Sequence, residues 1–215
     1  MAHISAAERR PQLVQAAIEL MAREGVDAGS TRAIAAELGV AQATVHYTFG
    51  TKRDLYRAVI EQMTVELVEL VRGAVPVEQD GPADFERSVR RMAEALWHAL
   101  LEQPGRFRLY VELTTYAVRS PDLHDLLRRH QRDLEETAAD LIAGVLARAD
   151  DAHAADPLVV ARFFLQGFDG LSLRHLVMGE GNPESAADKE SAADLERLLE
   201  ATLNLTRAGT PAPGA

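Results

Sequence analysis

The sequence predicts an all-α fold of about nine helices. Apolar residues recur at spacings of three and four along most of its 215 residues, which is the period of a helix that buries one face. No alternating pattern typical of a half-buried strand stands out, and no internal repeat is visible. Ser-Pro, Asp-Pro and Gly occur where the helical pattern stops and restarts, as at helix ends.

Four helices are predicted in the first third of the chain. A capping box that begins at Ser5 starts the first helix, and Gly25 ends it. Ser30 or Thr31 caps a short second helix, and Gly39 ends that one. A second short helix and then a long one follow. In order, the predicted ranges are 5–25, 31–38, 41–49 and 52–72.

Five more helices are predicted after Pro82. Residues 109–116 would pass for a strand by propensity alone, but their neighbours favour a helix. Ser120-Pro121 and Asp156-Pro157 each combine an N-cap with a proline at the first helical position. Residues 179–194 are interpreted as a polar loop or a weakly ordered linker, and the tail 209–215 as disordered. The predicted helical ranges are about 85–100, 106–118, 121–148, 157–178 and 193–207.

Charge is unevenly distributed along the chain, whose formal net charge is −10. Residues 1–57 contain seven Lys or Arg and six Asp or Glu, whereas the remainder contains 16 basic and 27 acidic residues. This asymmetry indicates two regions with different partners. A near-neutral segment is weak evidence for nucleic-acid binding, so the placement of its charges matters more than their sum.

Composition excludes several classes of protein. The chain has no cysteine, which rules out disulfides, thiolate metal sites and cysteine nucleophiles. We find no signal peptide, no stretch apolar enough to span a membrane and none of the common catalytic or cofactor-binding motifs. We therefore expect a cytoplasmic protein that is not an enzyme and has no metal site, no cofactor and no membrane partner.

The two short helices at 31–49 match a helix-turn-helix, in which the second helix enters the DNA major groove. Gly39 suits the turn between them because a glycine adopts conformations that other residues resist. An ordinary helical hairpin is the alternative. The small core predicted to hold the two helices together consists of Ile34, Leu38, Val40 and Val45.

A helical wheel of the second short helix separates a buried face from an outward one. With Val45 facing the core, Phe49 lies only 40° away and is also predicted to be buried. The outward face contains no carboxylate, and Lys52 follows where it could reach a phosphate. That face comprises Gln42, Ala43, Thr44, His46 and Tyr47.

On these residues the chain resembles the TetR family of bacterial transcriptional repressors. The resemblance rests on Thr31, on IAAELGV at 34–40 and, in the same order and spacing, on Thr44, Tyr47, Phe49, Lys52 and Leu55. It covers about 50 residues; the rest of the chain matches only in length and helical character. Ala41 departs from the family pattern, where a capping Ser or Thr is usual, and His46 stands where Tyr is common.

The resemblance implies a role in DNA binding for seven residues. Thr31, Thr44, Tyr47 and Lys52 would contact phosphate or sugar, although Thr31 also suits an N-cap and Tyr47 could merely pack at the domain edge. Gln42, Ala43 and His46 occupy base-reading positions, with His46 open between base and phosphate contact. Gln pairs well with adenine in the major groove.

The resemblance also implies an organisation into functional domains. We expect a helix-turn-helix domain at 1–52 and a helical effector-binding and dimerisation domain at 53–208. The expected partners are a palindromic double-stranded DNA operator, an unidentified small-molecule effector and a second copy, bound through the last two long helices. Aromatic and polar residues between 85 and 178 suggest the effector pocket, although an aromatic taken singly is more often plain core than a ligand contact. These residues are Trp97, Phe107, Tyr110, Tyr116, Phe163, Gln166 and Phe168.

A second hypothesis remains open from the sequence. The chain could be a helical small-molecule-binding or scaffold protein whose N-terminal hairpin no longer binds DNA. Salt-sensitive binding to duplex DNA would favour the repressor, because counterion release makes such binding fall steeply as salt rises.

Overall fold

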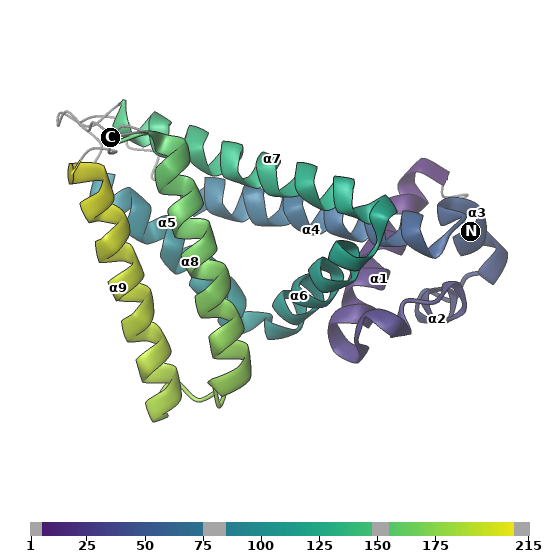
Figure 1. Cartoon of the computed structure of the whole chain (residues 1–215). Helices are drawn as coiled ribbons and strands as arrows, with labels where there is room; N and C mark the ends of the chain where they lie inside the picture. The colour runs from purple at the N-terminus through teal and green to yellow at the C-terminus, as the bar shows by residue number, and fades with distance from the viewer. Residues whose placement is uncertain (1–5, 75–84, 148–154, 209–215) are drawn as a thin grey trace. The chain divides into compact units, whose positions relative to one another are not determined.

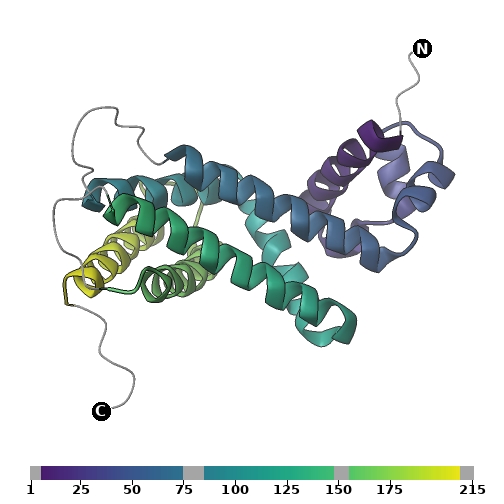
Figure 2. The same cartoon turned by 90° about the horizontal axis from the view of Figure 1, so that it is seen from above.

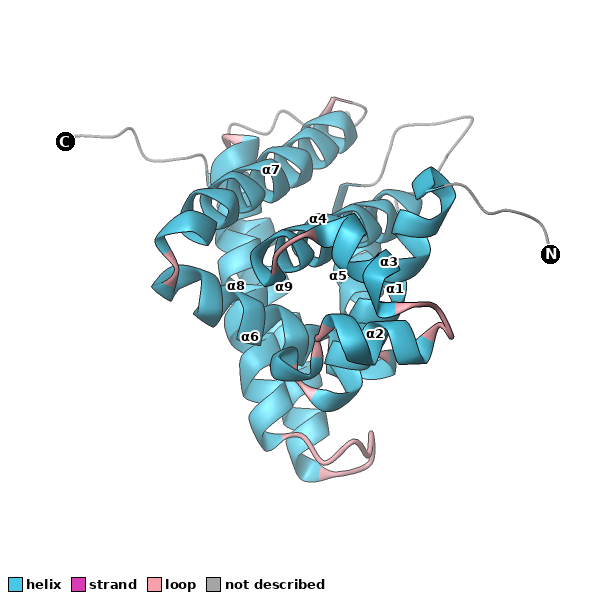
Figure 3. Cartoon of the chain, turned by 90° about the vertical axis from the view of Figure 1, so that its right-hand side faces the viewer, coloured by secondary structure: helices cyan, strands magenta, loops and turns pink. Residues whose placement is uncertain are grey.

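A computed structural model describes residues 6–74, 85–147 and 155–208 of the chain. Within these ranges it contains nine α-helices, one short 3₁₀ helix and no strand (Figure 3). The all-α prediction is therefore confirmed, and residues 109–116 are helical. The predicted cap at Ser5 and the predicted disordered tail at 209–215 lie outside the described residues.

Figure 1 shows how the described helices are arranged along the chain. None of the described helices is both long and apolar enough to cross a membrane. In chain order they are α1 Ala6–Glu24, η1 Val26–Ala28, α2 Thr31–Glu37, α3 Gln42–Phe49, α4 Lys52–Ala74, α5 Phe85–Glu102, α6 Pro104–Arg119, α7 Pro121–Leu146, α8 Pro157–Met178 and α9 Ala186–Ala208.

The helices form two compact units. Unit 1 comprises Met1–Glu66 and Gln103–His130, and unit 2 comprises Leu67–Glu102 and Gln131–Ala215. Two of the boundaries fall inside α4 and α7, which run unbroken from one unit into the other (Figure 2). These units are not the ranges 1–52 and 53–208, which stay a prediction about functional domains.

The core of unit 1 joins the helix-turn-helix to α1, α4 and α6. Ile34 of α2, Val45 of α3 and Leu55 of α4 are all buried in one apolar cluster that also contains Leu13 and Leu109. The predicted burial of Val45 and Phe49 is confirmed. Burying these side chains is what sets the angle between two helices that are too short to be stable alone.

One residue of the predicted small core lies elsewhere. Leu38 is 39% exposed, whereas Ile34, one helical turn earlier, is fully buried. Leu38 is the C-cap of α2, and Gly39 follows it with φ of +63°, a left-handed conformation that favours glycine. The chain therefore turns away from the core at this point, and the Leu38 side chain is left at the surface.

Unit 2 is built on the pairing of α8 with α9, which lie side by side (Figure 1). The helices approach closely at Gly167, where an added Cβ would come within 2.4 Å of Leu198 Cδ1. The core beneath them is aliphatic and aromatic. Its buried members include Val89, Met92, Leu96, Val160, Phe168, Leu171, Leu195, Leu199 and Leu203.

The interpretation of 179–194 as a loop is wrong for its second half, because α9 already begins at Ala186. The Ser185 hydroxyl accepts a hydrogen bond from the Asp188 amide at 3.1 Å, in the manner of an N-cap. The Asp188 carboxylate in turn accepts from the amides of Asn182 and Glu180, at 2.6 and 3.3 Å. The polar composition of this segment thus serves a helix start rather than a linker.

The N-caps of α2 and α3 differ in a way that predicts a stabilising substitution. The Ser30 hydroxyl accepts from the Ala33 amide at 3.1 Å, whereas Ala41, the N-cap of α3, has no side-chain cap. Ala41 has extended backbone angles that suit a capping residue. Ala41→Ser should raise the free energy of unfolding by about 1 kcal/mol, and Ser30→Ala should lower it by a similar amount. Urea denaturation checks both, and equal effects of the same sign would contradict the assignment.

Candidate nucleic-acid interface and ligand cavity

The exposed face of α3 presents hydrogen-bonding side chains and no carboxylate. Gln42, Ala43 and His46 are exposed, and Tyr47 is 90% exposed. Thr44 is half-buried, so it contributes less of this face than the wheel predicted. A solvent-exposed tyrosine on a short, carboxylate-free helix suits contact with another molecule better than packing at the domain edge.

The beginnings of α2 and α3 meet through two of the predicted DNA-binding residues. The Gln42 side-chain amide donates to the Thr31 hydroxyl at 3.3 Å. Thr31 is the first residue of α2, and Ser30 rather than Thr31 provides the N-cap. The Thr31 hydroxyl is therefore available at the same edge as Gln42, where backbone amides at both helix starts also favour an anion.

Lys52, the first residue of α4, lies between an acidic and an aromatic side chain. Its ammonium nitrogen is 3.3 Å from Asp27 Oδ1 and 5.3 Å from the centre of the Tyr56 ring. The interaction with Tyr56, and then that with Asp27, raises the pKa of Lys52. Asp27 is highly exposed, so the ion pair is weak and a phosphate could replace the carboxylate.

The 3₁₀ helix η1, which carries Asp27, is held at one residue, Val26, by side chains from two other helices. The Glu112 carboxylate of α6 accepts from the Val26 amide at 2.7 Å. The Tyr56 hydroxyl of α4 donates to the Val26 carbonyl at 3.2 Å, and Tyr116 of α6 packs edge-on against Tyr56 with ring centres 5.0 Å apart. Lys52, Asp27 and their supports therefore form one connected set within unit 1.

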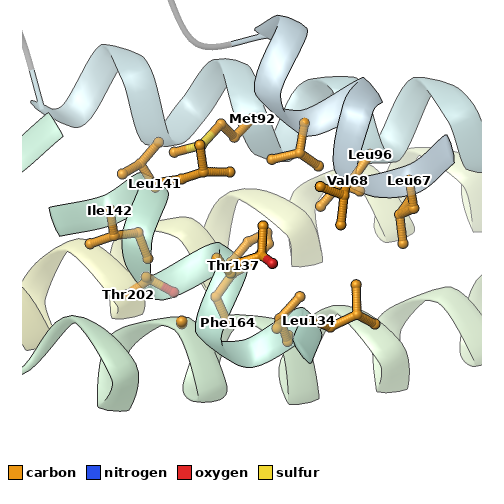
Figure 4. A pocket seen from close by; sticks show the side chains of 15 residues that line it. Leu67, Val68, Met92, Leu96, Leu134, Thr137, Leu141, Ile142, Phe164 and Thr202 are labelled. Atoms are coloured by element: carbon orange, nitrogen blue, oxygen red, sulfur yellow. The ribbon is translucent and has the colours of Figure 1, made fainter. Parts of the chain in front are cut away.

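Unit 2 contains a cavity lined by side chains of α4, α5, α7, α8 and α9 (Figure 4). The cavity has a volume of about 70 Å³, measured as the space that the centre of a water molecule can reach. This is several times the volume that one water molecule needs by the same measure. Within the part of the chain that the structure describes, the polar side chains of the lining are those of Thr137 and Thr202. The lining residues are Leu67, Val68, Val71, Val89, Met92, Leu96, Leu134, Thr137, Ala138, Leu141, Ile142, Ala161, Phe164, Leu165 and Thr202.

Two family models match different parts of the chain. Residues 13–59 match the bacterial regulatory proteins of the tetR family. Residues 85–204 match the C-terminal domain of BetI-type transcriptional repressors. The chain belongs to the TetR family. It is thus a ligand-responsive transcriptional repressor, and a scaffold protein without DNA binding is not favoured.

Individual relatives agree with this membership. The chain is 30% identical over 172 residues to the HTH-type nicotine-responsive transcriptional repressor HdnoR of Paenarthrobacter nicotinovorans, covering 80% of this chain and 86% of that protein. The structure of the multidrug binding protein EbrR, complexed with imidazole, matches with 27% identity and a TM-score of 0.62, over 96% and 93% of the two chains. A TetR-family regulator from Mesorhizobium loti, at 17% identity, shares the fold with a TM-score of 0.73 over 94% and 98%.

None of the seven residues predicted for the effector pocket of this TetR-family protein lines the cavity. Phe107, Tyr110 and Tyr116 belong to unit 1, where Tyr110 lies 5.9 Å from the His130 ring. Trp97 and Phe168 are buried in unit 2, against His175 and Phe164 respectively. Phe163 and Gln166 are on the exposed face of α8.

The difference has a physical reason. Aromatic rings are large and flat, and those of the seven predicted residues that are buried fill helix contacts, whereas the described cavity lining is mostly aliphatic, with Phe164 and two hydroxyls. The sequence-based range 85–178 also missed the contributions of α4 and α9. Leu67, Val68 and Val71 repeat at helical spacing, but ordinary core residues do the same, so no sequence signal separates them.

Proposed function

We propose that the protein acts as a homodimer that represses transcription by inserting α3 into successive major grooves of a palindromic operator. The observation that carries this proposal is the carboxylate-free, exposed face of α3 next to Lys52. Two-fold symmetric readers of this kind match two half-sites about one helical turn apart. Because operator DNA is in the cytoplasm of a bacterium, we place the protein there.

Each residue of this interface has a proposed role. Gln42, Ala43 and His46 read base edges, with the short Ala43 side chain permitting close approach. Thr31, Thr44, Tyr47 and Lys52 contact phosphate or sugar and set the register. Phosphate contacts supply affinity for all sequences, whereas base contacts supply preference.

The face proposed for dimerisation lies on α8, with α9 beside it. Its exposed side chains include Phe163, Leu173 and Val177, the last 72% exposed. Gln166 and Asp169 lie between Phe163 and Leu173 on the same face of α8. Together the five residues follow one another at spacings of three and four, so they form a single stripe. A second copy that covers the stripe would remove this apolar area from water.

The dimer face predicts a pH-dependent association. Desolvation of its carboxyl group between neighbouring side chains raises the pKa of Asp169 to about 6, although the residue as a whole is exposed. Covering the stripe would disfavour the charged carboxylate further, so the dimer should be tightest below about pH 6 and weaken as the carboxyl ionises above it. We expect the dimer dissociation constant to fall about tenfold or more from about pH 7.5 to about pH 5.5.

Sedimentation equilibrium of the full chain measures this change. Asp169→Asn should dimerise more tightly near neutral pH and lose most of the pH dependence. A pH dependence that survives the substitution would place Asp169 outside the dimer contact.

The effector is proposed to bind in the cavity of unit 2 and to act through α4. This one helix carries Lys52 at its first residue and Leu67, Val68 and Val71 in the cavity wall. A ligand that shifts α4 would therefore disturb a phosphate contact at its other end. The nicotine and imidazole in the names of the relatives belong to those proteins; the choice of ligand for this chain is argued from its own cavity below.

Two substitutions test the DNA-binding proposal by their different signatures. Lys52→Ala should weaken binding to every duplex alike. It should also reduce the number of counterions released on binding by about one, which makes the slope of log affinity against log salt concentration shallower. Gln42→Ala should relax the preference at one base pair by about 1–3 kcal/mol while leaving the affinity for other sequences nearly unchanged. Fluorescence anisotropy on a duplex library, repeated over a range of salt concentrations, measures both. Wild-type binding that does not respond to salt would overturn the proposal itself.

A further inference from the structure

We propose that the cavity of unit 2 takes an uncharged, mainly aliphatic molecule with a single hydrogen-bonding group, and that this group lies at Thr137. The inference rests on the proposed function in taking this cavity as the effector site. Three features of the lining carry it: the absence of charge, the placement of the two hydroxyls and the scarcity of aromatic rings.

No acidic or basic side chain is present in the lining that the described residues 6–74, 85–147 and 155–208 provide. Glu135, on the same helix as Thr137, is turned to another partner: its Oε2 accepts from Arg162 Nε at 3.0 Å. An ammonium or carboxylate ligand would therefore lose its hydration without gaining an opposite charge. Such a loss costs several kcal/mol for each ion, which is enough to exclude it.

The two hydroxyls of the lining are not equivalent. Thr202 donates to the Leu198 carbonyl of its own helix at 2.8 Å, so its proton is already used. No hydrogen bond to the Thr137 hydroxyl is found among the described residues, and its oxygen lies among the aliphatic side chains of the wall (Figure 4). Thr137 can donate to a ligand and accept from it, whereas Thr202 can only accept.

Aromatic side chains do not replace the missing charge. Among the described residues of the lining Phe164 is the one aromatic side chain, and its ring stacks on Phe168 with centres 5.9 Å apart. Several aromatic faces around one nitrogen would be needed to hold a desolvated cation. The rest of the wall is Leu, Val, Ile, Met and Ala, whose branched surfaces fit a saturated ring or chain.

A matched pair of probes tests the proposal with the full-length protein. Cyclohexanol and cyclohexylammonium have nearly the same shape and differ in the charge of one group. Isothermal titration calorimetry near neutral pH should show binding of cyclohexanol and at least about 100-fold weaker binding of the ammonium. Thr137→Val, which keeps the shape but removes the hydroxyl, should weaken cyclohexanol binding by up to about tenfold.

A second pair of variants shows whether the probe occupies this cavity. Ala138 lines the cavity and its neighbour Ala139 does not. Ala138→Leu should abolish cyclohexanol binding, while Ala139→Leu should leave it unchanged; circular dichroism checks that both fold. Should Ala138→Leu not fold, Thr137→Val remains the decisive variant.

The outcomes separate this inference from the proposed function. Failure of cyclohexanol to bind, equal binding of the ammonium, or undiminished binding to either Ala138→Leu or Thr137→Val would overturn the inference and leave the repressor role intact. Binding with the expected pattern supports the inference even where it leaves the affinity for DNA unchanged. If cyclohexanol binds as expected but does not change the affinity for DNA, the effector role proposed for the cavity is contradicted. The inference about the class of ligand that the cavity binds is then still supported.

Discussion

Ile34→Ala is expected to lower the free energy of unfolding by about 2–5 kcal/mol and to weaken binding to all DNA sequences together. Ile34 is fully buried where α2 packs on the core of unit 1, so the substitution leaves a cavity between helices that have little stability of their own. Urea denaturation and anisotropy on duplex DNA measure the two effects.

Leu38→Ala is the matched control, because it removes the same side-chain atoms, a four-carbon chain cut back to a methyl group, from a residue that the sequence also assigned to this core. Leu38 is partly exposed, so its substitution should cost no more than about 0.5 kcal/mol. Similar losses for the two variants would mean that Leu38 is buried in solution, contrary to the structure.

Glu112→Ala is expected to lower the free energy of unfolding by about 1–3 kcal/mol. It removes the acceptor for the Val26 amide, which is half-buried and 86 residues away in sequence. The same change should also reduce DNA affinity. The segment that carries Asp27 then loses one of its two supporting hydrogen bonds, and Asp27 no longer holds the Lys52 ammonium group in a fixed position. Glu112 touches no part of the proposed interface, so its effect on binding is one of positioning.

Glu112→Gln keeps an oxygen at the same place and should recover most of both losses. Thr115→Ala, an exposed change on the same helix, serves as a control for α6 itself. A Glu112→Ala protein that is destabilised but binds DNA with wild-type affinity and salt dependence would limit Glu112 to a structural role. Anisotropy at a temperature well below the unfolding midpoint distinguishes the two cases.

The fold was predictable from the sequence to within a few residues at most helix ends. Asp156 caps α8 through a 2.9 Å hydrogen bond from the Leu158 amide, as the Asp-Pro pair indicated. The start of α9 was missed because the polar Ser185 and Asp188 look like loop residues until their hydrogen bonds to nearby amides are seen. Composition alone does not distinguish a capped helix start from a linker.

The sequence by itself determined the helices, the helix-turn-helix and the outward face of α3, since these depend on periodicity and capping within a few turns of one helix. Only the tertiary structure decided which side chains line the cavity, that Leu38 is exposed, and that Glu112 of α6 holds the amide of Val26. The reason is that a helical period shows which residues share a face but not what that face meets. Contacts between residues 86 positions apart depend on how the helices pack, and the same aliphatic spacing serves a solid core or the wall of a cavity equally well.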